Sequence, residues 1–274
     1  DERWHDAWLI NVVTGESKLA LRNDGFSSVV ADKSLAVRLA AKPTKDGGLE
    51  YFRRDGAEWT PFTTVPSDDA LTTEPLFFTA GNKSLYVLDS RGRDKAALTL
   101  VDVRTKSGTL VAESGKSDIG YVIAHPATNE VLAYAVDYDR MKWVALKPEL
   151  KVDIEFLDKQ VTGYWTVLSQ SKDGNFWTLW IDNSGEPIKF GLYDRKRRTL
   201  TKLFAARPNL EGAPLPKMHA RVIKARDGLD LVSYLTLPKG SDAGEDGVPD
   251  KPLPMVLLVH GGPWSRDGFA YSPP

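Results

Sequence analysis

The sequence contains no cysteine among its 274 residues, which excludes disulfide bonds, thiolate metal sites and a cysteine nucleophile. It also lacks an excess of charge, because 36 Lys and Arg residues stand against 37 Asp and Glu residues. Nucleic-acid-binding domains usually carry a basic surface, so we expect no nucleic-acid partner. The apolar runs are far shorter than the ~20 residues of a membrane-spanning helix, so we expect no membrane partner. No targeting segment is visible, and the compartment stays open.

Metal-binding patterns are lacking as well. The sequence has no His-Glu-x-x-His motif and no paired cysteines, and we interpret His5, His125 and His219 as structural residues. Residues 242–250 form an acidic stretch, but glycines stand where calcium ligands would be needed. A solvated loop is the better interpretation of that stretch. We therefore expect neither a metal nor a cofactor.

Short apolar runs that alternate with polar turns fill the first 200 residues. One series of turns centres on Asn11, Asp55, Asp102, Pro148 and Asp194, with steps of about 46 residues. A second series lies between them, at Asp32, Asn82, Asn129 and Asp173. Two hairpins in each period of 40–50 residues are typical of a four-stranded propeller blade.

The fold class that this periodicity predicts is mainly β: a partial β-propeller of about four to five four-stranded blades. A β-sandwich is the alternative, but sandwiches do not usually keep a two-hairpin period through four cycles. No stretch longer than a few residues has the pattern of an amphipathic helix. The first repeat shows only its second hairpin, so we expect the chain to begin in mid-blade. An unpaired blade edge favours pairing with further strands, which here means upstream residues or self-association through the open edge.

The character of the sequence changes after this repeat. Residues 208–217 are rich in proline and predict a semi-rigid linker, so residues 1–207 form the predicted partial propeller. A hairpin is expected next, turning at Asp227-Gly228. Residues 218–274 are predicted to be the first strands of a truncated α/β-hydrolase domain.

Residues 255–264 contain the motif that most directly suggests a catalytic role. Met255-Val256-Leu257-Leu258-Val259 predicts a strand buried on both faces, and His260-Gly261-Gly262-Pro263 follows it. Adjacent glycines let backbone N–H groups approach a ligand closely, as an oxyanion hole requires. A glycine turn without chemistry is the alternative for this motif.

The order of these parts resembles the prolyl oligopeptidase family of serine peptidases, and His-Gly-Gly-Pro is most similar to its acylaminoacyl-peptidase-like branch. The resemblance is strongest over residues 219–264 and looser through the propeller. It implies that the backbone N–H of Gly262 is an oxyanion donor, with Gly261 beside it. It also implies that His260 shapes this loop and is not the base of the Ser-Asp-His triad. In that family the propeller caps the active site and admits short peptides.

The sequence departs from the family in one respect. The nucleophile should lie in a Gly-x-Ser-x-Gly elbow, and none occurs; Gly25-Phe26-Ser27-Ser28-Val29 lacks the second glycine. Without a nucleophile and base, acyl transfer cannot proceed. We therefore interpret the chain as the substrate-gating and oxyanion-loop portion of a peptidase that hydrolyses short or N-blocked peptides, inactive by itself.

Two other functions remain open: a propeller-based binding or scaffold module, and a parent esterase that acts on non-peptide esters. A Gly-x-Ser-x-Gly elbow downstream in the reading frame would favour the peptidase over the scaffold. Asp139 and Arg140 follow an expected inner strand, so they are candidates for contact with the substrate. A local salt-bridged turn is the alternative for that pair.

Overall fold

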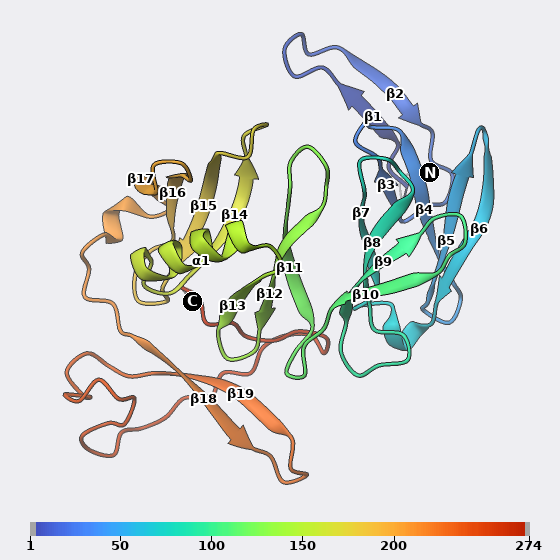
Figure 1. Cartoon of the computed structure of the whole chain (residues 1–274). Helices are drawn as coiled ribbons and strands as arrows, with labels where there is room; N and C mark the ends of the chain where they lie inside the picture. The colour runs from blue at the N-terminus through green and yellow to red at the C-terminus, as the bar shows by residue number, and fades with distance from the viewer. Residues whose placement is uncertain (1–3, 272–274) are drawn as a thin grey trace. The chain divides into compact units, whose positions relative to one another are not determined.

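The computed structural model describes residues 4–271, and antiparallel strands make up most of them (Figure 1). The chain divides into two compact units. Unit 1 runs to Ile119 and includes Ala127–Glu130; unit 2 comprises Gly120–Pro126 and the chain from Val131 onward. None of the helices in the described part of the chain is long and apolar enough to cross a bilayer.

Unit 1 contains a two-stranded hairpin and two four-stranded sheets. The hairpin pairs β1 (Ala7–Ile10) with β2 (Ser17–Leu21) around the predicted tip at Asn11. The first sheet is a meander of β3 (Ser28–Ala31), β4 (Val37–Pro43), β5 (Leu49–Asp55) and β6 (Glu58–Val65). After the short helix η1 (Ser67–Asp69) comes the second meander, of β7 (Glu74–Phe78), β8 (Ser84–Asp89), β9 (Ala97–Asp102) and β10 (Gly108–Ala112). Each four-stranded meander has the composition of a propeller blade.

Unit 2 contains a three-stranded sheet, a helix, a four-stranded sheet and a hairpin. The three-stranded sheet is built from β11 (Ile119–Ala124), β12 (Val131–Asp137) and β13 (Met141–Ala145), and α1 (Pro148–Gln160) follows it. The four-stranded sheet is built from β14 (Tyr164–Gln170), β15 (Phe176–Asp182), β16 (Lys189–Asp194) and β17 (Thr199–Ala205). The short helix η2 (Pro208–Leu210) precedes the hairpin of β18 (Met218–Lys224) and β19 (Asp230–Thr236).

The predicted fold class is confirmed, since the sheets follow the two-hairpin period of a partial propeller. Turns lie at all four expected positions of the inner series and at four of the five expected positions of the outer series. The domain limits expected at residues 207 and 218 stay a prediction. Residues 1–3 and 272–274, at the outer ends of the first and last expected domains, lie outside the described part of the chain.

Two expectations about residues near Pro148 are wrong. Pro148 is not a hairpin tip but the first residue of α1, which has 13 residues, although no helix of that length was expected. Proline fits the first helical turn because its missing N–H would have no partner there. Leu150, Ile154 and Leu157 are buried, and their spacing places them on one helix face. That face packs into the same core as Trp165 of β14.

The inner turns of unit 1 are joined by side-chain hydrogen bonds. Asn82 Nδ2 donates to Asp32 Oδ2 over 2.9 Å, and Asn129 Nδ2 donates to Phe78 O over 2.8 Å. Asp32 is almost fully buried and also accepts from the Arg38 guanidinium at 2.7 Å. The turns that mark the sequence period therefore also link one sheet to the next.

We expect Asp32→Asn to lower the free energy of unfolding by about 2 kcal/mol at pH 7, because hydrogen bonds to a charged group are lost. Burial raises the pKa of Asp32, but hydrogen bonds from Ser34, Arg38 and Ala36 outweigh it and hold the pKa well below its usual range. A carboxylate with a depressed folded pKa stabilises above its unfolded pKa and loses this contribution as pH falls. The difference between variant and wild type should therefore shrink below about pH 4. Urea unfolding of both proteins at pH values from 7 to 2 measures this difference in the free energy of unfolding.

The control for this variant is Asp55→Asn, at the exposed turn between β5 and β6. It should leave the free energy of unfolding at pH 7 within about 0.5 kcal/mol of the wild-type value. A constant difference between Asp32→Asn and wild type at all pH values would contradict a charged Asp32.

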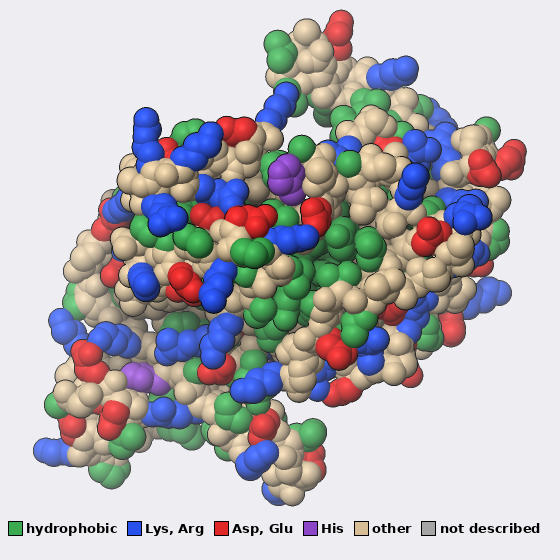
Figure 2. All heavy atoms as spheres, in the orientation of Figure 1, with side chains coloured by type: hydrophobic (Ala, Val, Ile, Leu, Met, Phe, Trp, Pro, Cys, Tyr) green, Lys and Arg blue, Asp and Glu red, His purple; other side chains and the backbone are tan. Residues whose placement is uncertain are grey.

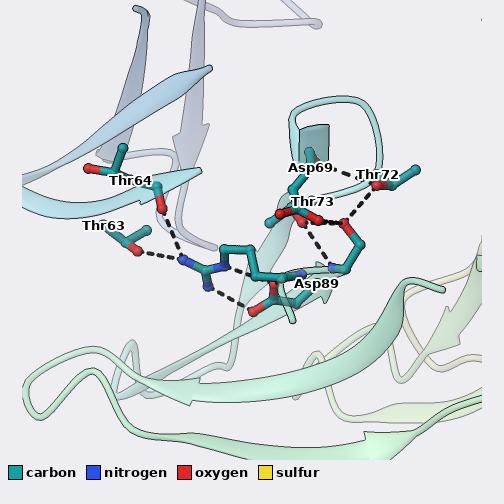
Figure 3. Close-up of polar contacts among 8 residues, drawn as sticks. Thr63, Thr64, Asp69, Thr72, Thr73 and Asp89 are labelled. Atoms are coloured by element: carbon teal, nitrogen blue, oxygen red, sulfur yellow. Dashed lines mark hydrogen bonds and ion pairs between the residues drawn. The ribbon is translucent and has the colours of Figure 1, made fainter. Parts of the chain in front are cut away.

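A second polar network joins the two four-stranded sheets of unit 1 (Figure 3). Arg91 forms a two-bond ion pair with Asp89, at 2.8 and 2.7 Å, and donates to Thr63 Oγ1 of β6 at 2.7 Å. Beside it, the Ser90 hydroxyl donates to Asp69 at 2.6 Å. A cavity of about 150 Å³ lies next to the Arg91 side chain. These hydrogen bonds fix the two neighbouring sheets together.

Candidate functional site

The apolar stretch before the glycine turn does not form the expected buried strand. Residues 255–259 have no strand assignment, and their side chains are 71–91% exposed. A strand at the centre of a sheet is defined by hydrogen-bonded neighbours on both sides. None of the strands described in the chain pairs with this stretch, so the prediction of a buried strand is wrong.

The turn at residues 260–263 requires glycine at one position. Gly262 has φ of 149°, and a Cβ added there would lie 2.9 Å from the Trp264 backbone nitrogen. A Cβ at Gly261 would meet open space. Gly262 is therefore the position where only glycine fits. The backbone at 262 can approach a ligand without a side chain in the way.

His260 lies within the same exposed turn. Its Nδ1 is 2.7 Å from Gly261 O and donates to this oxygen when it carries the proton. Ser265 N donates to Pro263 O at 3.0 Å on the other side of the turn. These local bonds are compatible with the loop-shaping role expected for His260, which stays a prediction.

The segment after the glycine turn, residues 266–271, is anchored in unit 2, and we call it the anchor segment. Arg266 Nη1 donates to Asp137 O at 2.8 Å, and Nη2 donates to Tyr138 O at 2.5 Å. Nη2 also lies 3.3 Å from the Tyr234 hydroxyl. One guanidinium thus binds the β12–β13 turn and strand β19 together.

Two more contacts hold the anchor segment. Phe269 is buried, with the Arg140 guanidinium 4.1 Å from its ring centre and the Tyr234 ring 6.1 Å away. Tyr271 N donates to Asp182 Oδ1, at the end of β15, over 2.8 Å. The segment is therefore attached at its beginning, middle and end.

Asp139 and Arg140, the expected substrate-contact residues, lie beside the anchor segment. Arg140 stacks on Phe269, and Asp139 O accepts a hydrogen bond from the Tyr234 hydroxyl at 3.2 Å. Arg140 therefore contacts a residue seven positions after Gly262, and Asp139 contacts Tyr234, which packs on that same residue. Their contact with substrate stays a prediction, and Arg140 also has a packing role.

Burial governs the ionisable groups around the anchor segment. It raises the pKa of Asp137; the charge of Arg266 partly offsets this increase, and the charge of Asp139 adds to it. Burial also raises the pKa of Asp182, whose Oδ2 is buried without a hydrogen-bond partner among the described residues. The Tyr164 pKa is raised by burial and by the charges of Asp182 and Asp137. In the described part of the chain no three His, Asp or Glu side chains are placed to hold a metal ion.

Sequence reasoning missed Arg266, Phe269 and Tyr234. The available signal was slight: Arg266 and Asp267 are the only charged residues that follow the glycine turn. The partners of Arg266 lie about 130 positions earlier in the chain, and no local pattern reveals them. On the face in Figure 2, Lys and Arg side chains lie among Asp and Glu side chains, in keeping with the balanced composition.

Comparison with known proteins gives relatives along nearly the whole chain. The chain is 41% identical over 274 residues to dipeptidyl aminopeptidase BIII of Pseudoxanthomonas mexicana, covering 99% of the chain and 40% of that protein. It is 29% identical over 296 residues to dipeptidyl peptidase family member 6 of Caenorhabditis elegans, covering 98% of this chain and 40% of that protein. The chain thus spans about 40% of the length of these curated relatives. No family model matches it.

Solved structures share the fold at low identity. Dipeptidyl peptidase 4 of Porphyromonas gingivalis superposes with a TM-score of 0.54 at 14% identity, over 84% of this chain and 34% of that one. A puromycin-hydrolyzing peptidase of Mycobacterium tuberculosis superposes with a TM-score of 0.51 at 14% identity, over 81% of this chain and 36% of that one. The acylaminoacyl-peptidase-like branch stays a prediction, since the named relatives are dipeptidyl peptidases. Propeller sheets, a glycine turn that follows them and a relative at 41% identity establish that this chain belongs to the prolyl oligopeptidase family of peptidases.

Proposed function

We propose that the protein expressed from its full reading frame, called the full-length protein below, is a serine peptidase that releases dipeptides from short peptides. In this proposal the chain supplies part of a substrate-gating propeller and the oxyanion turn. The observation that carries it is the turn at Gly262, where only glycine fits. The 41% identity to a dipeptidyl aminopeptidase supports the choice of substrate.

The proposed role of Gly262 follows from the chemistry of acyl transfer. A serine attacks the scissile carbonyl, and the carbonyl oxygen becomes an oxyanion in the tetrahedral intermediate. A backbone N–H that already points at this oxygen stabilises the charge without reorganising. The N–H of Gly262 is the proposed donor. No Gly-x-Ser-x-Gly pentapeptide occurs in the 274 residues, so the nucleophile and its Asp and His partners are proposed to lie elsewhere in the full-length protein.

The gating role belongs to the propeller sheets. Antiparallel blades around a channel can exclude large substrates while short peptides pass. Four successive sheets of the chain follow the blade period, which supports this role. Short peptides are therefore the proposed substrate class.

We expect a fluorophosphonate probe, which labels activated serines, to modify the full-length protein and to leave the 274-residue chain unlabelled. The reason is that labelling needs the nucleophile and its base, which the chain does not carry. Gel fluorescence after probe treatment measures both proteins side by side. Stoichiometric labelling of the 274-residue chain, or none of the full-length protein, would contradict the proposal.

The substrate is tested with a matched pair of chromogenic dipeptides that differ only in acetylation of the amino group. A dipeptidyl peptidase cleaves the free form and not the blocked form. The opposite preference would favour the N-blocked substrates implied by the acylaminoacyl-peptidase-like resemblance. Hydrolysis of simple esters alone would favour an esterase, and no hydrolysis of any of them would favour a scaffold module.

A further inference from the structure

The glycine turn depends on the anchor segment for its position. Residues 260–264 are exposed, and the hydrogen bonds described for the turn join its own residues. Three positions separate Gly262 from Arg266, where contacts with unit 2 begin. Whatever fixes Arg266 therefore fixes how far the turn can move.

Arg266 makes a contact that few other side chains can make. Its planar guanidinium reaches two successive carbonyl oxygens, those of Asp137 and Tyr138, at 2.8 and 2.5 Å. Charge-assisted hydrogen bonds of this kind are short and strong. A lysine ammonium is a flexible point charge and does not reproduce the fork geometry. The position is therefore specific for arginine.

Phe269 and Tyr271 N act on the same segment in other ways. Phe269 is only 7% exposed and contacts both the Arg140 guanidinium and the Tyr234 ring. Tyr271 N binds the nearly fully buried Asp182. These contacts set the path of the segment beyond Arg266, while Arg266 is the contact nearest to the turn.

We propose that Arg266 is a positioning residue for the oxyanion turn, which it holds by binding the β12–β13 turn through the Asp137 and Tyr138 carbonyls. This inference rests on the proposed function of Gly262. An oxyanion donor must be placed to within about 0.5 Å to act on the transition state. A loss of the Arg266 contacts lets the turn move without removing any group that touches the substrate.

The test is Arg266→Ala and Arg266→Lys in the full-length protein, with kcat and KM measured on an unblocked dipeptide substrate. We expect kcat to fall by about 100-fold in Arg266→Ala, as for a misplacement of about 1 Å, with little change in KM. Arg266→Lys should fall between Arg266→Ala and wild type. Arg93→Ala is the matched control, because Arg93 pairs with Glu113 on the surface of unit 1; its kinetics should equal those of wild type.

A peptidyl boronate separates positioning from a structural role, because it mimics the tetrahedral intermediate. Its affinity should fall in parallel with kcat in Arg266→Ala, while the melting temperature stays close to that of wild type. Unchanged kcat in Arg266→Ala would overturn the proposal. The proposal would also be overturned if kcat fell together with a lower melting temperature and a raised KM. That result would favour a role of Arg266 in folding.

A milder variant keeps the proposal testable if Arg266→Ala does not fold. Tyr234→Phe removes only the hydroxyl next to Arg266 and Asp139, and kcat should fall by about fivefold, as for one neutral hydrogen bond. An unchanged kcat in this variant would count against the positioning role. Wild-type protein that cleaves no peptide would instead refute the proposed function, which distinguishes the two failures.

Discussion

Replacing Gly262 by proline in the full-length protein is expected to lower kcat by about 10²–10³-fold, equivalent to about 2.7–4 kcal/mol of transition-state stabilisation. Proline removes the backbone N–H that we assign to the oxyanion. Substrate binding does not need this donor as strongly, because the oxygen carries full charge only in the transition state. KM should therefore change far less than kcat. Steady-state kinetics on a dipeptide substrate measure both.

Gly262→Ala separates the donor from the shape of the turn. It keeps the N–H, but its Cβ would lie 2.9 Å from Trp264 N at a φ that favours glycine, so the turn must move. An intermediate loss of kcat is expected. Gly120→Ala is the control, since Gly120 is exposed in strand β11 and an added Cβ meets open space. Normal turnover in Gly262→Pro would show that residues 260–263 are a glycine turn without chemistry.

The sheets could be predicted from the sequence because their signals are local. A polar tip between two apolar runs marks a hairpin wherever it occurs, and the tips at Asn82 and Asn129 both adopt φ of 55°. Asparagine tolerates this left-handed conformation better than most residues. The period of the tips then predicts the blade, since each blade needs two hairpins.

The features that the sequence did not predict depend on distant residues. Residues 255–259 have the composition of a buried strand, but burial needs neighbours that the described strands do not supply. The partners of Arg266 lie far away in the chain, and no spacing rule connects them. Helix α1 is not predicted for another reason: Pro148 lies where the period of the turns predicts a hairpin tip, and this period conflicts with the helical spacing of the apolar residues that follow.

Helix α1 provides the other large expected effect, through Asp153. This carboxylate is 5% exposed and accepts hydrogen bonds from the Tyr193 hydroxyl at 2.9 Å and from Arg195 Nε and Nη2 at 2.9 and 2.6 Å. Arg195 also lies over the Trp177 ring, 4.7 Å from its centre. Asp153 thus attaches the helix to strand β16 and to the aromatic core of unit 2.

Asp153→Ala is expected to lower the free energy of unfolding by about 3 kcal/mol, because it breaks a buried ion pair by removing one partner. Burial raises the pKa of Tyr193, and the hydrogen bond to Asp153 raises it further. The phenol therefore keeps its proton, and in Asp153→Ala its hydroxyl loses this acceptor. Urea unfolding followed by tryptophan fluorescence measures the change, since Trp165 and Trp177 are buried in the same core.

Glu155→Ala on the same helix is the matched control. Glu155 and Lys151 are both exposed, and their charged atoms are 3.9 Å apart, so the variant should change the free energy of unfolding by less than about 0.5 kcal/mol. Equal effects of the two substitutions would mean that α1 is held by Leu150, Ile154 and Leu157 alone. A large effect of Asp153→Ala alone would mean that the helix is fixed by a charge that its apolar spacing does not reveal, because Asp153 lies on the buried face among those leucine and isoleucine side chains.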